Sequence, residues 1–414
     1  MSKRTLSIFL VVIAGEAIFM LPFVIPRLYR PLMLEAWGIS NTDFGQAFAA
    51  YGLTAMISYL FGGPLADRFH PRTLMSLSLF LTAFGGIYLI SFPGALNLIA
   101  TYAFFGVSTI FLMWGALIKT THVAGGNENR SLAMGILDGG RGLAAAAYAS
   151  GLVFIIYLMV PELTTAAQQG SALRVIYVVT VCFLIVVALG IWFLLKDFIV
   201  SNEKQVAWNR QKIVLSLKSA NVWLLSIVIL GSYCAYKAID NYATYLVTVQ
   251  KLDLARSSLF TSLVFWARPI SAIATGFIAD HFHNKNHSAR FFILAVLLVL
   301  SGAAQFFLAS AENFVLQVSF AVMISSAAFA YALRTIYFSL FGDLNVPNNL
   351  IGTTVGIVSF VGFMPDIFFG WVTGRLIDEN PGALGFQLAF DFTGVCVLFG
   401  AIASFMLLRR SPRP

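Results

Sequence analysis

Long apolar runs alternate with short polar turns along the whole chain of 414 residues. A membrane-spanning α-helix needs about 20 predominantly apolar residues, and twelve runs reach that length. They cover residues 6–34, 44–64, 73–92, 96–119, 132–160, 173–195, 220–249, 257–279, 290–310, 313–341, 350–375 and 386–408. The pattern therefore predicts an all-α polytopic membrane protein with twelve transmembrane helices.

One polar turn recurs in the second half of the chain. Residues 62–72 read GGPLADRFHPR and residues 276–282 read GFIADHF, so that Asp280 follows Asp67 by 213 positions, about half the chain. Such a repeat is typical of membrane proteins built from two related halves. We expect two pseudo-symmetric six-helix bundles, residues 1–195 and 220–414. A cytoplasmic linker, residues 196–219, joins them and is the longest polar stretch between spans.

Composition and charge place the chain in lipid and orient it. Hydrophobic residues make up 59% of the chain and charged residues 11%, whereas a soluble chain carries about 25% charged residues. With the amino end inside, 16 basic residues fall on the cytoplasmic side and four on the other, as the positive-inside rule requires. This predicts both termini in the cytoplasm and a plasma-membrane location, most simply a bacterial inner membrane. The net charge of +8 is spread over turns, which argues against nucleic-acid binding.

Ten charged residues fall inside the predicted spans. The basic ones are Arg27, Arg30, Arg141, Lys237, Arg268 and Arg334, and the acidic ones are Glu16, Asp138, Asp240 and Asp366. A charge at the bilayer centre costs at least about 2.5–3.5 kcal/mol, so these side chains are expected to face a protein interior or a water-filled cavity. Arg30, near the outer end of span one, is expected to extend its charge to the membrane interface.

The embedded charges follow two corresponding helices. On span one, helical spacing aligns Glu16, Met20, Phe23, Arg27 and Arg30, although Pro22 and Pro26 must kink that helix. On span seven it aligns Tyr233, Tyr236, Lys237, Asp240 and Thr244. Corresponding helices of the two halves meet where such folds bind their ligand. The arrangement predicts a cationic site, with Tyr29, Trp114, Tyr233, Tyr236 and Trp266 as candidate aromatic contacts.

Internal ion pairing is the alternative to a cationic site. Asp138 with Arg141, and Lys237 with Asp240, are spaced i, i+3 and can neutralise each other. Arg27 and Arg268 would then be the basic residues left for a ligand. Asp366, which follows Pro365 near the centre of span eleven, is either a proton carrier or a fixed counter-ion, and Glu16, Asp138 and Asp240 are further candidates for these roles. Arg334 is either an inner gate or an anchor.

Other kinds of site find little support in the sequence. Asp280, His281, His283 and His287 are grouped in one turn, but no cysteine is near and a metal site is not expected there. The chain lacks a nucleophile elbow, a zinc-protease motif and a phosphate-binding loop. We therefore expect neither an enzyme nor a bound cofactor. The three cysteines lie in apolar segments and predict no disulfide framework.

The turn at residues 62–72 resembles the signature loop between helices 2 and 3 of the major facilitator superfamily. The resemblance implies the fold of that family, and a conformational latch formed by the matching residues Asp67, Arg68 and Arg72 and by Asp280 in the second copy. The second copy departs from the pattern, because His281 occupies a position where a basic residue is usual.

The same resemblance implies a carrier function. Arg27 and Lys237 resemble the two basic residues that hold the ligand in organic-anion and organophosphate carriers, although Arg27 is shifted by about one turn and Arg141 has no counterpart there. We expect a monomeric secondary active transporter that moves a small anionic solute, an organic acid or phosphate ester, by alternating access. Coupling to protons or exchange for another anion are both compatible with the sequence. A drug or lipid exporter of the same fold is the alternative.

Overall fold

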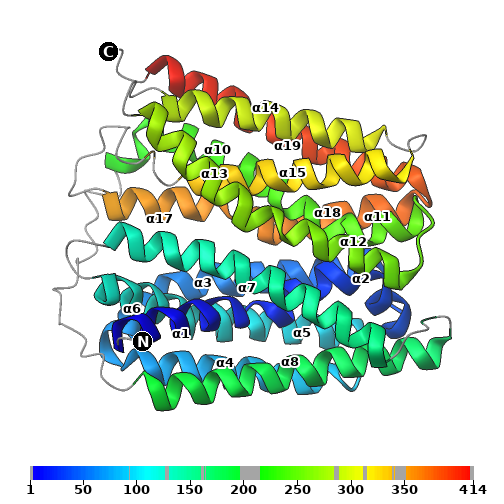
Figure 1. The fold of residues 1–414 in the computed structure, drawn as a ribbon. Helices are drawn as coiled ribbons and strands as arrows, with labels where there is room; N and C mark the ends of the chain where they lie inside the picture. The colour runs from blue at the N-terminus through cyan, green and yellow to red at the C-terminus, as the bar shows by residue number, and fades with distance from the viewer. Residues whose placement is uncertain are drawn as a thin grey trace. The chain divides into compact units, whose positions relative to one another are not determined.

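The computed structural model is helical throughout the part of the chain that it describes (Figure 1). It describes residues 3–410 except 93, 126–129, 160–162, 164, 196–214, 284–288, 311–314, 338–339 and 341–350. The side chains of Asp67 and Asp280, and most of the predicted linker, lie outside the described residues.

The first ten helical elements follow the first six predicted spans. They are α1 Lys3–Ala17, η1 Met20–Val24, α2 Ile25–Trp37, α3 Asn41–Arg68, α4 Pro71–Leu89, α5 Ala95–Gly106, η2 Val107–Trp114, α6 Gly115–Gly125, α7 Arg130–Met159 and α8 Ala166–Leu194. The remaining elements are α10 Ala220–Ala238, η3 Ile239–Asn241, α11 Tyr242–Thr248, α12 Leu254–Phe265, α13 Ala267–His283, α14 Ala289–Ala309, α15 Leu316–Ile336, α17 Ile351–Gly362, α18 Pro365–Glu379 and α19 Ala383–Arg410.

The helices account for the predicted spans. Within the described residues, ten helices are long and apolar enough to cross a membrane, and an eleventh span is a pair bent by 41°, Leu6–Ala17 with Met20–Trp37. The bend confirms the predicted kink, because η1 is a π-helical segment that contains Pro22 and Pro26 lies just after it. At the position of the second predicted span lies α3, a more polar helix of 28 residues.

Local sequence signals set the boundary between α2 and α3. Gly38, at φ 63°, ends α2 in the left-handed conformation that glycine adopts without strain. The Ser40 hydroxyl then accepts a hydrogen bond from the Asp43 backbone N–H, and the Asp43 carboxylate accepts one from the Ser40 backbone N–H. This reciprocal capping box satisfies two backbone donors and starts α3 at Asn41.

The chain forms two compact units. The first contains Met1–Gln205 with Ala243–Val247 and Lys251–Trp266, and the second contains Val206–Tyr242, Thr248–Gln250 and Ala267–Pro414. In the first unit α3 packs on α5, α4 on α8, and α1 on α7; in the second, α19 packs on both α14 and α10 (Figure 1). The boundary predicted at residues 196–219 stays a prediction.

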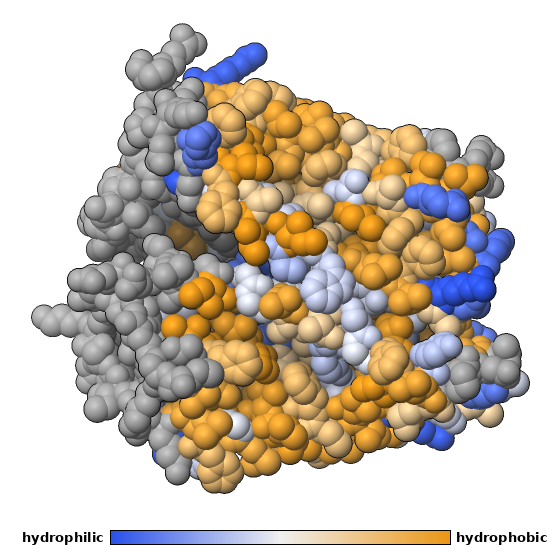
Figure 2. Space-filling model, viewed as in Figure 1, coloured by the Kyte–Doolittle hydropathy of each residue, from blue (hydrophilic) through white to orange (hydrophobic). Residues whose placement is uncertain are grey.

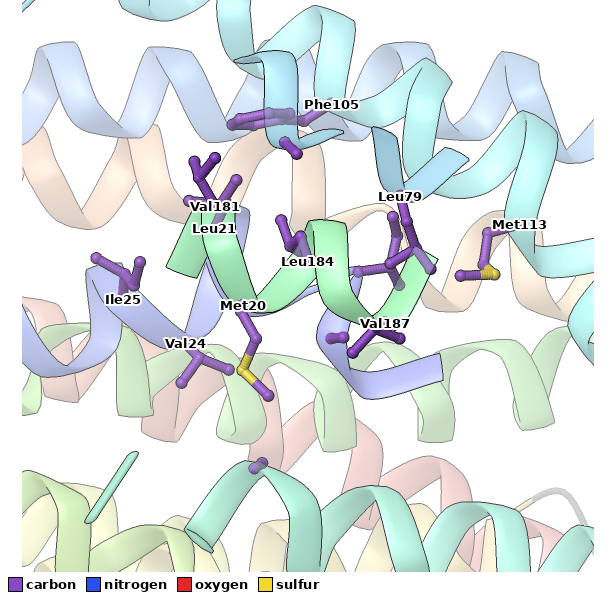
Figure 3. Packing of buried hydrophobic residues seen from close by; sticks show 14 of the residues in the cluster. Met20, Leu21, Val24, Ile25, Leu79, Phe105, Met113, Val181, Leu184 and Val187 are labelled. Carbon is purple, nitrogen blue, oxygen red and sulfur yellow. The ribbon is translucent and has the colours of Figure 1, made fainter. Parts of the chain in front are cut away.

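The core of the first unit is built from apolar side chains of many helices. Figure 3 shows Leu21 of η1 close to Val181 of α8. Gly86 of α4 makes room for them, since a Cβ there would lie 2.6 Å from Leu21 Cδ1 and 2.7 Å from Val181 Cγ2. In the second unit Gly231 and Gly400 let α10 and α19 approach closely, the small-residue packing expected of membrane helices.

Large apolar side chains also cover the outside of the protein. The side chains of Phe84 on α4 and Phe277 on α13 are 67% and 76% exposed, and the described surface in Figure 2 is mostly apolar. An apolar surface of this extent is unstable in water and stable against lipid tails.

Candidate functional site

A buried ion pair lies in the first unit between α1 and α7. Arg141 Nε is 3.1 Å from Glu16 Oε2, and the two side chains are 10% and 5% exposed. The Arg141 guanidinium also lies over the rings of Phe19 and Trp114, at 5.3 and 5.7 Å from their centroids. The structure pairs Arg141 with Glu16 of another helix, and the pair of Asp138 with Arg141 suggested by the sequence stays a prediction. Asp138 itself is exposed on α7.

Arg27 is buried among aromatic rings of the same unit. Its side chain is 4% exposed and its guanidinium lies 5.8 Å from the centroid of Phe23. Phe23 in turn stacks on Phe48 at 5.8 Å and meets the edge of Tyr51 at 4.8 Å. Aromatic faces attract a cation, so these contacts help to hold the Arg27 guanidinium in place.

Arg30 corrects an expectation from the sequence. The side chain is 1% exposed, donates a hydrogen bond from Nη2 to the Asn41 carbonyl at 3.3 Å and lies over the ring of Phe44. The prediction that Arg30 extends to the membrane interface is therefore wrong. Its helix changes direction by 41° at the bend around η1, which a straight helical spacing does not reveal.

The second unit gathers two carboxylates around one lysine. Lys237 Nζ lies 2.7 Å from Asp240 Oδ2 and 3.6 Å from Asp366 Oδ1. The Tyr233 hydroxyl donates to the Asp366 carboxylate, 3.1 Å from Oδ1 and 3.0 Å from Oδ2. Lys237 is 1% exposed and Asp240 is 4% exposed. The predicted pair of Lys237 and Asp240 is thus confirmed, and Asp366 joins it from α18.

Arg334 of α15 contacts the tyrosines of that cluster. Its guanidinium lies 4.2 Å from the centroid of Tyr236 and 5.9 Å from that of Tyr233. Tyr236 also meets Tyr331 edge-on at 5.9 Å. Sequence reasoning placed Arg334 at a gate or anchor and missed this contact, because nothing in the spacing of span ten relates it to span seven.

Arg268 lies on α13 and is half-buried. On the same helix the Ser271 hydroxyl donates to the Ala267 carbonyl at 2.6 Å. Thr275, on the same helix, is buried. The ligand-binding role of Arg268 stays a prediction.

The residues of the predicted latch are only partly described. Arg68 is exposed in the last turn of α3, and the Arg72 guanidinium lies 5.3 Å from the ring centroid of Trp192 on α8. Lys119 of α6 donates from Nζ to the Ala66 carbonyl at 3.3 Å, which places a cation at the negative end of α3. The sequence identified Lys119 only as a cytoplasmic charge and missed this contact. The latch role of Asp67, Arg68, Arg72 and Asp280 stays a prediction.

Metal-ligating side chains do not gather in the described part of the chain: it contains no group of three or more His, Cys, Asp or Glu residues suited to a metal ion. Three of the residues in the histidine-containing turn, Asp280, His283 and His287, have side chains outside that part.

Comparison with known proteins identifies relatives along nearly the whole chain. The family model described as Major Facilitator Superfamily matches residues 6–370. The inner membrane proteins YqcE and YihN of Escherichia coli are 24% and 23% identical, over 93% and 99% of this chain and 90% and 97% of their own lengths. The probable sulfoacetate transporter SauU of Cupriavidus necator is 24% identical over 91% of this chain and 87% of its own.

Solved structures show the same fold. A bacterial homolog of the human lysosomal transporter Spinster, crystallised inward-facing and unoccupied, superposes with a TM-score of 0.74 at 15% identity and covers 100% of this chain and 99% of its own. The occupied inward-facing form gives a TM-score of 0.68 at 16% identity, with coverage of 99% and 96%.

Proposed function

This chain belongs to the Major Facilitator Superfamily, and on that premise we propose that it is a secondary active carrier that moves a small anionic solute by alternating access. It is a multi-pass membrane protein with the fold of known transporters. The solute class, the alternating-access cycle and a monomeric state are parts of the proposal.

The observation that carries the proposal is a surplus of buried positive charge. Among the described residues, four basic residues are, as whole residues, less than 9% exposed, against two acidic ones; they are Arg27, Arg30, Arg141 and Lys237 against Glu16 and Asp240. The half-buried Arg268, Arg334 and Asp366 leave the surplus in place. Buried cations are costly and in membrane proteins typically mark functional sites, and an anionic ligand that enters beside them offsets that cost.

The basic residues divide by their surroundings. Arg141 and Lys237 contact carboxylates, so their charges are largely balanced within the protein. Arg27 and Arg334 lie over aromatic rings, whose faces attract a cation. We propose Arg27 in the first unit, and Arg268 and Arg334 in the second, as candidate anion contacts, since a guanidinium offers paired donors to a carboxylate, sulfonate or phosphate. Tyr233 and Tyr236 would border an anion bound at Arg334.

The relatives support the solute class and the location. One is named a probable transporter of sulfoacetate, a small organic acid with two anionic groups. Two others are named inner membrane proteins of a bacterium. We propose an organic acid as solute, the bacterial inner membrane as location and both termini in the cytoplasm.

Uptake into reconstituted vesicles tests the proposal, with labelled sulfoacetate as the first probe. Removing one charged contact costs about 1.5–3 kcal/mol of binding, which is about 10- to 150-fold in KM. We expect that loss for Arg27→Met and Arg268→Met, with partial recovery in Arg27→Lys. Arg256→Met, which changes an exposed arginine, is the matched control. Unchanged uptake by both charge-removing variants would contradict a cationic site.

A further inference from the structure

Two of the three cysteines are neighbours in the second unit. Cys234 on α10 is fully buried, and Cys396 on α19 is half-buried. The two thiols interact with each other, and Cys396 packs against the buried cluster of Cys234, Ala238 and Phe369. Cys182, on α8 of the first unit, is exposed. The carrier function proposed above assigns no role to any of these thiols.

The crossing of α10 and α19 explains why the two thiols meet. A Cβ added to Gly231 of α10 would lie 2.9 Å from the Cys396 carbonyl oxygen, and a Cβ added to Gly400 of α19 would lie 3.6 Å from the Ile227 carbonyl oxygen. Residues further along α10 thus face residues further back along α19, so the two helices are antiparallel here. The next turn of α10 after Gly231 therefore brings Cys234 to Cys396.

The glycines at this crossing also favour a covalent bond between the helices. Small residues at a contact between membrane helices let the two backbones approach closely. A disulfide needs such an approach, because its two Cα atoms must lie about 4.4–6.8 Å apart. Gly231 and Gly400 provide it one turn from each cysteine.

The two thiols differ in how easily an oxidant reaches them. Oxidation of a cysteine depends on its exposure, and cysteines that sense oxidants often lie beside a second cysteine that resolves the first product. Cys396 is the more exposed of this pair, whereas Cys234 is sealed by the surrounding cluster. An oxidant would therefore react first at Cys396, with Cys234 already next to it.

We propose that Cys234 and Cys396 form a site of reversible oxidation, at which a peroxide joins the two thiols as a disulfide between α10 and α19. The peroxide transfers one oxygen to the Cys396 sulfur, which becomes a sulfenic acid; the O–O bond breaks and the rest of the peroxide leaves as water or an alcohol. The Cys234 sulfur then bonds to the Cys396 sulfur, and its proton leaves with the sulfenic hydroxyl as water. The disulfide is neutral, which suits the apolar cluster around it.

Oxidation of the purified full chain in lipid vesicles tests the proposal without a transported solute. Hydrogen peroxide in the water phase and cumene hydroperoxide, which dissolves in the lipid, form separate arms that distinguish the side from which Cys396 is reached. Each is raised until Cys182 is oxidised, so that this exposed thiol reports the dose. Free thiols are then alkylated, and the digested protein is analysed by mass spectrometry.

We expect the peptides of Cys234 and Cys396 to be joined in at least one arm, with the loss of two hydrogen atoms, and to separate on treatment with dithiothreitol. Recovery of both as alkylated free thiols in both arms would overturn the proposal. The measurement uses the wild-type chain, so it does not depend on whether a variant folds. Failure of the anion proposal would leave its outcome unchanged.

Three variants test the roles of the individual thiols. Cys182→Ala should keep the joined peptides. Cys234→Ala should stop the reaction at Cys396, whose sulfenic acid reacts with dimedone, whereas Cys396→Ala should leave Cys234 unlabelled at the same dose. Equal dimedone labelling in the last two variants would contradict the assignment of Cys396 as the first thiol to react. The thermal midpoint should rise on oxidation of wild-type protein and stay unchanged in Cys234→Ala.

Discussion

The ion pair of Glu16 and Arg141 allows a direct measurement of how much a buried charge pair contributes to the free energy of unfolding of this protein. Replacing Arg141 with methionine keeps the length of the side chain and leaves the Glu16 carboxylate buried without this cation. Breaking one side of a buried ion pair typically costs about 3–5 kcal/mol, because the remaining charge stays out of water. We expect Arg141→Met to lower the free energy of unfolding by that amount.

The chain contains a matched control for this experiment. Arg256 Nε lies 3.2 Å from Asp253 Oδ2, nearly the separation found at Arg141, but the two side chains are 72% and 57% exposed. Exposed pairs contribute about 0–1 kcal/mol, so Arg256→Met should change stability by no more than that. The contrast separates the effect of burial from that of arginine removal.

A double variant tests the physical reason. Glu16→Gln combined with Arg141→Met leaves no charge behind, so most of the lost stability should return. The double variant still lacks the cation contacts with Phe19 and Trp114, which leaves it about 1 kcal/mol below wild type. Equilibrium unfolding in mixed detergent micelles, followed by circular dichroism, measures the free energy of unfolding of the two single variants and of the double variant. Equal losses of stability in Arg141→Met and Arg256→Met would refute the argument. A double variant that is no more stable than Arg141→Met would also refute it.

Two glycine positions test the helix packing. A Cβ at Gly106 would lie 2.5 Å from the Tyr51 carbonyl oxygen, so Gly106→Ala should destabilise the first unit by about 1–3 kcal/mol. Gly151, with nothing within 4 Å of its added Cβ, should tolerate alanine or gain up to about 1 kcal/mol. Gly231→Ala would place a Cβ 2.9 Å from a backbone carbonyl of α19 and should lower the thermal midpoint, whereas Gly276→Ala in open space should not.

The sequence predicted the structural features that are determined within a single helix. Run lengths identified the spans, Pro22 and Pro26 identified the bend, and the i, i+3 spacing identified the pair of Lys237 and Asp240. These features follow from helix geometry within one segment, where neighbours three or four residues apart share a face.

Contacts between different helices could not be predicted from the sequence. The pairing of Arg141 with Glu16 and the position of Arg334 over Tyr236 depend on which helices are neighbours and on their rotation about their axes. A periodic apolar pattern does not set that rotation when a span is hydrophobic on every side, as membrane helices are. The burial of Arg30 was missed for a related reason, since the bend at η1 changes the direction of its helix.

The two π-helical segments give this chain an unusual tolerance for changes in length. Phe19 immediately precedes η1 and Trp114 is the last residue of η2, and both rings lie under the Arg141 guanidinium. A π-helical turn contains one residue more than an α-helical turn. Loss of a single residue in either segment would therefore restore α-helical pitch and leave the flanking turns facing as before. A one-residue deletion at η1 or η2 is thus expected to preserve the aromatic rings around Arg141, whereas the same deletion in a regular α-helical turn would rotate the rest of that helix by about 100°.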